Sequence, residues 1–98
     1  MSSEISLDRA LHAIADPTRR KILLELKKPA SKGKASGDCL CGGDIEERVR
    51  LSQPTISHHM AILIRSGLVE VKKQGQWRWY RRNEKAIRSV AKMLRGKL

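Results

Sequence analysis

The segment from Leu51 to Val69 most constrains this chain, because both ends of a helix are marked within it. Ser52 can accept a hydrogen bond from an otherwise unpaired backbone N–H, and Pro54 falls in the first turn, where a missing N–H costs little. Gly67 suits the left-handed position that follows many helices. The sequence therefore predicts a helix over residues 52–67.

This helix has one apolar and one polar side. Ile56, Met60 and Leu63 follow an i, i+4, i+7 pattern, so they form one stripe that packs inward. The polar residues of the first two turns then point elsewhere, and these are Gln53, Thr55, Ser57 and His58. Such side chains can reach base edges and phosphates, so the pattern predicts a helix that reads DNA.

Length and charge agree with a nucleic-acid partner. A chain of 98 residues is the size of a single domain, and 21 Lys and Arg against 10 Asp and Glu give a formal net charge of +11. Surfaces charged only for solubility usually carry a smaller and more mixed charge. We therefore expect a polyanion as the partner, with a membrane surface a more remote alternative.

Two helices are expected before this segment. The first covers about residues 4–15, with Leu7, Leu11 and Ile14 at helical spacing, and Asp16 and Pro17 then begin a second helix that ends near residue 28. Residues 29–38 contain many turn-forming residues and lysines and show no apolar period, so we expect a flexible basic loop. Its default role is a solvated linker, although its lysines could touch DNA.

After this loop the sequence predicts a helix-turn-helix, a hairpin and a last helix. Asp44 can cap a short helix that precedes the 52–67 helix, and residues 68–73 and 76–82 resemble strands around Gln74 and Gly75. From Asn83 onward an amphipathic basic helix follows, with an apolar stripe at Ile87, Val90, Ala91, Leu94 and Leu98. The fold class is thus mainly α with a β-hairpin wing, in the order ααααββα. Apolar stripes on the two terminal helices exceed what so small a fold can cover, so we expect a homodimer joined through them.

Three stretches together resemble the ArsR/SmtB family of winged helix-turn-helix repressors: residues 15–23 (ADPTRRKIL), 52–60 (SQPTISHHM) and 75–80 (GQWRWY). The resemblance implies a dimer that binds an inverted repeat in double-stranded DNA and is released by an inducer. It also implies that Gln53, Thr55, Ser57 and His58 face the major groove, that Ser52 approaches the backbone, and that His59 packs inward. Neighbouring residues on a helix diverge by about 100°, so His58 and His59 are not expected to chelate a metal together.

The hairpin carries positive charge and all three aromatic residues. Six positively charged residues in and just before the hairpin are expected to contact phosphates, and these are Arg65, Lys72, Lys73, Arg78, Arg81 and Arg82. Gln76, next to the hairpin turn, is also expected to contact DNA. Alternation places Trp77 and Trp79 on one face and Tyr80 on the other, with Arg78 and Arg82 on the side of Tyr80. We interpret the aromatic residues as anchors of the sheet rather than as platforms for single-stranded bases.

The inducer is suggested only by Cys39 and Cys41. Three interpretations stay open: a soft-metal or arsenite site at the two thiols, a redox or reactive-sulfur sensor, or inert cysteines. The family pattern of two cysteines before the helix-turn-helix matches Cys41, but Gly43 stands where the second would be. Asn83 to Leu98 contains no Asp or His, so no zinc site is expected there, and no cofactor is required.

Other classes are less well supported. A general basic nucleic-acid or RNA-binding protein would share the charge and aromatic residues but would prefer single strands. An enzyme is not expected, because no catalytic set of Ser, His and Asp or of paired carboxylates occurs in a context that would build a pocket. The sequence contains no signal peptide and no apolar run near the ~18 residues of a membrane span, so we expect a cytoplasmic protein with no membrane partner.

Overall fold

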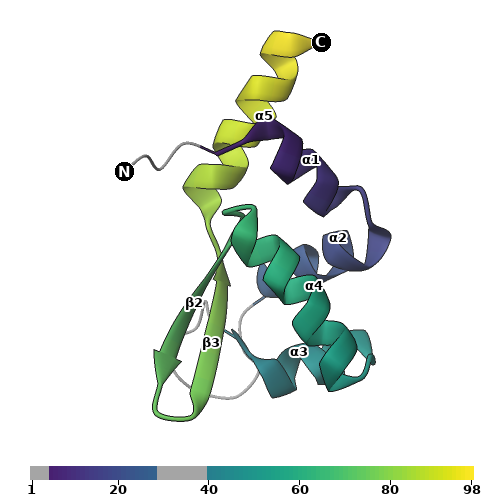
Figure 1. Cartoon of the computed structure of the whole chain (residues 1–98), viewed down its shortest axis with the longest axis vertical. Helices are drawn as coiled ribbons and strands as arrows, with labels where there is room; N and C mark the ends of the chain where they lie inside the picture. The colour runs from purple at the N-terminus through teal and green to yellow at the C-terminus, as the bar shows by residue number, and fades with distance from the viewer. Residues whose placement is uncertain (1–4, 29–39) are drawn as a thin grey trace.

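A computed structural model describes residues 5–28 and 40–98. These residues form five helices and a three-stranded sheet (Figure 1). In chain order the elements are α1 (Leu7–Ile14), α2 (Pro17–Leu26), β1 (Leu40–Cys41), α3 (Gly42–Val49), α4 (Gln53–Arg65), β2 (Val69–Gln74), β3 (Trp77–Arg82) and α5 (Glu84–Lys97). This is a winged helix-turn-helix fold, as expected, with one strand more than the sequence predicted.

The two N-terminal helices begin at side-chain caps. Ser6 accepts from the backbone N–H of Arg9 at the start of α1, which is shorter than the expected helix over residues 4–15. Asp16 caps α2 and Pro17 is its first residue, as the sequence predicted. The expected basic loop at residues 29–38 lies outside the described residues, and so does Cys39.

The sheet has the order β1, β3, β2, and both pairs are antiparallel. Val71 of β2 lies opposite Tyr80 of β3, and the chain turns between these strands at Gly75, whose φ is +61°. On the other edge Leu40 and Cys41 pair with Tyr80 and Trp79. β1 was not predicted from the sequence, since two residues are too few to show a strand period.

The start of α3 also corrects an expectation. Asp44 was predicted to cap this helix, but the helix begins at Gly42 and Cys41 is its N-cap residue. Asp44 is the third helical residue, and its carboxylate accepts a hydrogen bond from the backbone N–H of Cys41 at 3.2 Å. The carboxylate therefore reaches back to the helix start from within the first turn.

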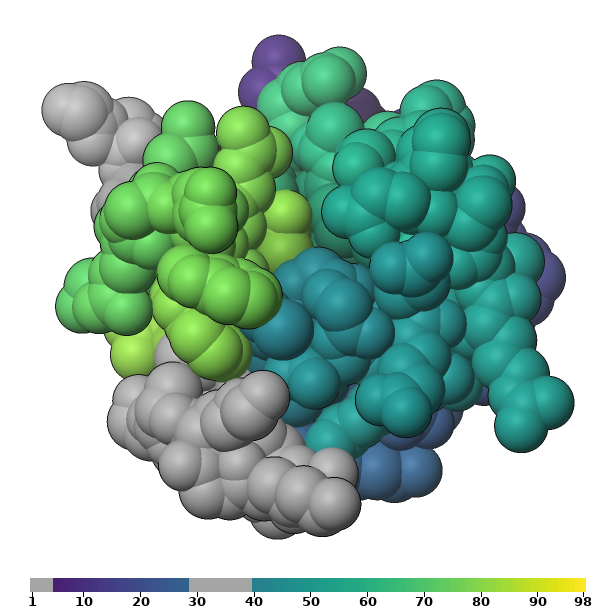
Figure 2. Space-filling view, turned by 90° about the horizontal axis from the view of Figure 1, so that it is seen from below, coloured from purple at the N-terminus to yellow at the C-terminus, as the bar shows by residue number. Residues whose placement is uncertain are grey.

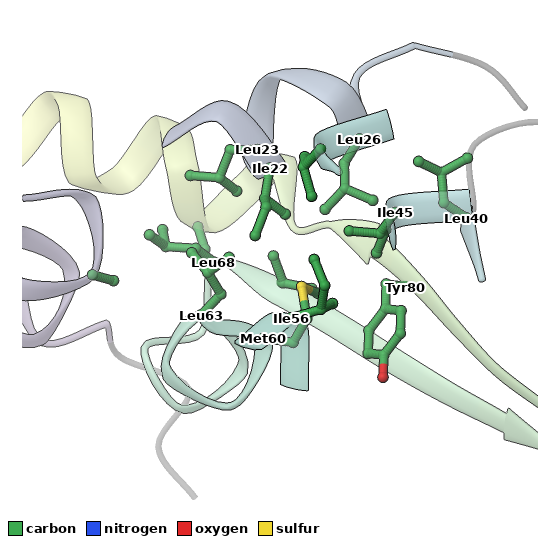
Figure 3. Packing of buried hydrophobic residues seen from close by; sticks show 14 of the residues in the cluster. Ile22, Leu23, Leu26, Leu40, Ile45, Ile56, Met60, Leu63, Leu68 and Tyr80 are labelled. Carbon is green, nitrogen blue, oxygen red and sulfur yellow. The ribbon is translucent and has the colours of Figure 1, made fainter. Parts of the chain in front are cut away.

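One hydrophobic cluster unites the described elements (Figure 3). The predicted stripe of α4, Ile56, Met60 and Leu63, is buried to 2% exposure or less. It packs with residues of α2, β1, α3 and the sheet, including Ile22, Leu26, Leu40, Ile45, Leu68 and Tyr80. The inner side of α4 therefore packs against most of the fold.

The terminal helices leave part of their apolar stripes uncovered, as the sequence predicted. In α1 the buried residues are Ala10 and Ala13, whereas Leu11 is 38% exposed. In α5 Ala86 and Val90 are buried, Ala91 is exposed, and Leu98 is fully exposed. Figure 1 shows α5 extending past α1 to the far end of the molecule. Apolar side chains on both helices thus remain uncovered within one protomer.

The three aromatic residues of the wing were expected to anchor the sheet, but they differ in burial. Tyr80 is buried at 8% exposure, whereas Trp77 is 57% exposed. Trp77 and Trp79 share a face, as predicted, but this is the outer face, where their rings stack with centroids 6.4 Å apart. Tyr80 is therefore the buried aromatic anchor of the sheet, whereas Trp77 is exposed and Trp79 is half-buried beside it.

The newly identified strand yields a stability test. Leu40 is 1% exposed, so Leu40→Ala should lower the free energy of unfolding by about 2–5 kcal/mol through lost burial and a cavity. Lys27→Ala is the control, because Lys27 is exposed at the end of α2, lies outside the apolar stripes of α1 and α5, and should change little. Urea denaturation at equal protomer concentration measures both. Equal losses in the two variants would contradict the placement of β1 in the core.

Candidate nucleic-acid interface

The start of α4 is built by Ser52. Its hydroxyl oxygen lies 3.5 Å from the backbone nitrogen of Thr55, from which it accepts, and 3.0 Å from the Thr55 hydroxyl, to which it donates. Pro54 occupies the first turn, as predicted. The helix ends at Arg65, and Gly67 follows with a φ of +87°, a conformation that a side chain would disfavour. The predicted ends of this helix are therefore confirmed to within two residues.

The polar face of α4 is open to solvent. Gln53, Thr55, Ser57 and His58 are all exposed, whereas Ile56 and Met60 beside them are buried. The structure thus brings the predicted base-contacting side chains together on the first two turns of one helix. Ser52 is exposed beside them, although its hydroxyl is already engaged by Thr55.

His59 is half-buried, so it packs inward only in part, and its partner is Arg19. The guanidinium Nη1 of Arg19 lies 3.1 Å from Nδ1 of His59, and the Arg19 side chain is almost completely buried. This contact joins the start of α2 to α4. Nothing in the local sequence pattern indicated it, because the two residues are 40 positions apart.

The start of α2 concentrates charge near this contact. Burial would raise the pKa of the Asp16 carboxyl, but hydrogen bonds from the backbone N–H groups of Thr18 and Arg19, with the charges of Arg19 and His59, lower it overall. Burial lowers the pKa of His59, and nearby Arg19 and His58 lower it further against the opposing effect of Asp16. The imidazole is therefore kept neutral beside a permanent cation.

The wing presents a second set of predicted contacts. Lys72, Lys73, Gln76 and Arg78 are exposed along the end of the hairpin, and Lys73 lies opposite Arg78 in the strand register. On the face shown in Figure 2, α3 lies between the wing and α4. Two cationic or polar surfaces therefore flank one side of the protein, at the ends of rigid elements.

Two of the six cations expected to reach phosphates are engaged within the chain. Arg82 is largely buried, donates to the carbonyl of Leu23 at 3.1 Å and pairs with Glu84 at 2.7 Å. Arg81 forms an ion pair with Glu70 at 3.0 Å. The expectation for Arg82 is wrong, since its guanidinium is used to join the base of the wing to α2. Its position on the same face as Tyr80 was predicted correctly.

Arg65 lies apart from the other predicted contacts. It occupies the last turn of α4, about 18 Å along the axis from Gln53, and lines a shallow pocket with Asp8 and His12 of α1. The structure therefore does not group Arg65 with the polar first turns of α4.

Cys41 lies at the junction of β1 and α3. Its side chain is buried, and its thiol donates to the Asp44 carboxylate, with Sγ 3.3 Å from Oδ2. Across the sheet it pairs with Trp79 of the wing. Chemical modification of this sulfur would therefore alter contacts with both α3 and the wing.

A soft metal or arsenite requires several thiolates, and the described residues offer it one. Within residues 5–28 and 40–98 no group of three His, Cys, Asp or Glu side chains is placed to hold a metal ion. The carboxylate of Asp44 beside Cys41 is a hard oxygen donor and does not complete a soft site. A two-thiol site would need Cys39, which is outside these residues.

Comparison with known proteins supports the fold and its role. A family model described as "Helix-turn-helix domain" matches residues 14–72. The transcriptional repressor SdpR of Bacillus subtilis is 38% identical over 77 residues, which are 79% of this chain and 76% of that protein. The arsenic resistance transcriptional regulator ArsR1 of Pseudomonas putida is 34% identical over 83 residues, which are 85% of this chain and 59% of that protein.

A solved structure extends the match to the whole architecture. The ArsR-like transcriptional regulator from Rhodococcus sp. RHA1 has a TM-score of 0.72 and 29% identity, with 91% of this chain and 76% of that chain covered. This chain belongs to the ArsR/SmtB family. It is a DNA-binding transcriptional regulator of the winged helix-turn-helix type, and α4 is the second helix of its helix-turn-helix pair.

For this ArsR/SmtB regulator, no helix among the described residues is long and apolar enough to cross a membrane. The relatives named above are transcriptional regulators, and none is named as an enzyme.

The charged start of α2 in this ArsR/SmtB protein gives a pH-dependent prediction. The pKa of Asp16 is lowered from its usual 3.8, so the stabilisation from its charge is fully present above that value and is lost as the pH falls through it and below. Asp16→Asn keeps a capping oxygen but removes the charge. The difference in unfolding free energy between wild type and variant should therefore shrink on acidification. A difference that stays constant down to about pH 2 would contradict the lowered pKa.

Proposed function

We propose that this protein is a repressor that binds an inverted-repeat operator in double-stranded DNA as a homodimer. The observation that carries the proposal is the exposed polar face on the first two turns of α4, next to a cationic wing. Gln53, Thr55, Ser57 and His58 would read base edges in the major groove, with Ser52 near the backbone. Lys73, Gln76 and Arg78 would contact phosphates beside the adjacent minor groove.

We propose that the whole chain folds as a single DNA-binding domain. All described elements contribute to one hydrophobic cluster, which supports residues 1–98 acting as one unit. Arg65 lies at the far end of α4, so it would contact only the DNA backbone, where the duplex extends beyond the first turns of this helix.

The dimer follows from the uncovered apolar side chains. Leu11 of α1 is exposed, and Met93 and Leu94 of α5 are only partly buried. A shallow groove of about 400 Å³ between α2 and α5 is lined mostly by apolar side chains, among them Ile14, Leu23, Ile87 and Leu94. Pairing of α1 and α5 with those of a second copy would bury this surface, and the resulting two-fold symmetry would match an inverted repeat.

Release from DNA is proposed to depend on a thiol-directed signal at Cys39 and Cys41. The support is the position of Cys41, whose hydrogen bond to Asp44 lies at the start of α3 and whose strand neighbour Trp79 lies in the wing. Oxidation, sulfur addition or capture of arsenite at this sulfur would disrupt that hydrogen bond. The naming of ArsR1 for arsenic resistance agrees with a thiol-directed signal of this kind.

Operator binding is tested by fluorescence anisotropy with a promoter inverted repeat, a scrambled duplex of equal composition, and single-stranded RNA. The inverted repeat should bind most tightly, with two protomers per duplex. Gln53→Ala should weaken discrimination between the two duplexes, by about 1–3 kcal/mol per lost base contact. Lys73→Ala should weaken binding to both alike and reduce the salt slope by about one.

Equal affinity for the two duplexes would contradict sequence-specific recognition. Tighter binding of single-stranded RNA would favour the alternative of a general basic nucleic-acid-binding protein, for which the +11 charge and the exposed Trp77 are the supporting observations.

The sensor proposal is tested by adding arsenite, hydrogen peroxide or polysulfide to the preformed DNA complex. The wild-type complex should dissociate with at least one reagent, and Cys39→Ser and Cys41→Ser should each prevent that release. Cys41→Ser is nearly isosteric and keeps a hydroxyl donor toward Asp44, so DNA binding without reagent should persist. Identical responses in all three proteins would show that the cysteines are inert toward these signals.

A further inference from the structure

Arg19 is the most buried charged residue among the described parts of the chain, at 6% exposure. Its Nε donates to the carbonyl of Ala13 at 2.7 Å, and its Nη2 donates to the carbonyl of His12 at 3.2 Å. These carbonyls belong to the last turn of α1, and the His12 carbonyl also accepts from the backbone N–H of Ala15, the C-cap residue. One side chain of α2 thus ties down the end of α1.

The same guanidinium forms an ion pair with the Asp16 carboxylate, with Nη1 3.9 Å from Oδ2, and it also reaches α4. Nη1 of Arg19 lies 3.1 Å from Nδ1 of His59. Arginine keeps all its protons at any pH that a protein tolerates, so Arg19 is the donor and Nδ1 must carry a lone pair. The ring is therefore neutral, with its proton on Nε2. A hydrogen bond of this kind is lost when Nδ1 is protonated, because two donors would then face each other.

The groups around His59 oppose its protonation. From α2 it faces the guanidinium of Arg19 and, at the helix start, the carboxylate of Asp16. From its own helix it faces His58, whose ring centroid is 5.5 Å away. α1 contributes carbonyl oxygens that are already bonded to Arg19. Burial, Arg19 and His58 together outweigh Asp16 and place the pKa of His59 below its usual 6.5.

The position of this contact connects it with DNA binding. His59 directly follows the exposed His58 and precedes the buried Met60, and its own burial is intermediate, so it borders both the exposed polar face and the buried stripe of α4. Any change in the distance between α2 and His59 would shift the base-reading turns of the same helix. The buried stripe sets which side of α4 faces the core, and the contact between Arg19 and His59 adds a polar restraint next to the base-reading turns.

We propose that Arg19 and His59 are positioning residues for DNA binding: their hydrogen bond holds the recognition helix in its binding orientation, and acidification weakens DNA binding by protonating His59. Neither residue needs to touch DNA. The inference rests on the proposed role of α4 as the DNA-reading helix. Each protomer must release one proton from His59 before it can bind DNA. The DNA affinity should therefore fall by up to about tenfold per pH unit for each protomer, in the range where His59 titrates.

The test compares operator affinity between pH 7.5 and pH 5.5, at constant salt, for wild type, His59→Asn and His12→Asn. The amide oxygen of Asn can accept from Arg19 in place of Nδ1 but does not titrate. His59→Asn should bind within about threefold of wild type at pH 7.5, and the ratio of the two affinities should then change steadily in favour of the variant on acidification. His12→Asn is the matched control, since the His12 ring is exposed and only its carbonyl takes part; its profile should follow wild type.

Taking the ratio to wild type cancels the effects of pH that are common to both proteins, such as those on the DNA. Parallel pH profiles for wild type and His59→Asn would overturn the inference while leaving operator recognition intact. Nitrogen NMR of the His59 ring in the free protein gives a second readout that does not require DNA. An Nε2–H tautomer that persists below pH 6.5 supports the inference, and an Nδ1–H tautomer or a raised pKa overturns it. Absence of any operator preference in wild type at pH 7.5 would instead contradict the proposed function.

Discussion

The packing of the inner stripe of α4 is the constraint on which the rest of the structure depends. Ile56, Met60 and Leu63 insert into a cluster formed by α2, α3, β1 and the base of the wing (Figure 3). Because this stripe uses one side of the helix completely, the polar side chains of the first two turns must face solvent. The hairpin packs on the same cluster through Tyr80 and Val69, so the wing is held at a fixed position relative to α4.

Polar contacts complete what apolar packing leaves undetermined. Arg82 joins the base of the wing to α2 through the Leu23 carbonyl, and Arg19 joins the end of α1 to α2 and α4. Arg19 is buried and Arg82 is partly buried, and their guanidinium groups donate to carbonyls, a carboxylate or an imidazole. In a protein with a formal charge of +11, these two arginines therefore serve the packing of the fold, whereas Lys72, Lys73 and Arg78 of the wing are exposed to solvent.

Much of this arrangement is readable from the sequence, where the signals are local. The Ser52 and Asp16 caps, the α4 stripe and the hairpin around Gly75 all follow from side-chain chemistry within a few residues. Prediction from the sequence failed for features that depend on residues far away in the chain. β1 forms because it can pair with the edge of β3, and Trp77 and Trp79 lie on the opposite face of the sheet from Tyr80 and Val71, which pack inward. The burial of Arg82 and the Arg19 to His59 contact depend on partners 59 and 40 residues away.

In this structure the first turns of α4 and the end of the wing together present the surface proposed to bind DNA. An NMR titration of the ¹⁵N-labelled protein with an operator duplex tests this assignment. The largest amide shift changes should fall at residues 53–58 and 72–78, and the exposed basic residues Lys21 and Lys27 of α2 and its C-terminus should stay unchanged. Shift changes spread evenly over all exposed lysines and arginines, or confined to residues outside α4 and the wing, would contradict it.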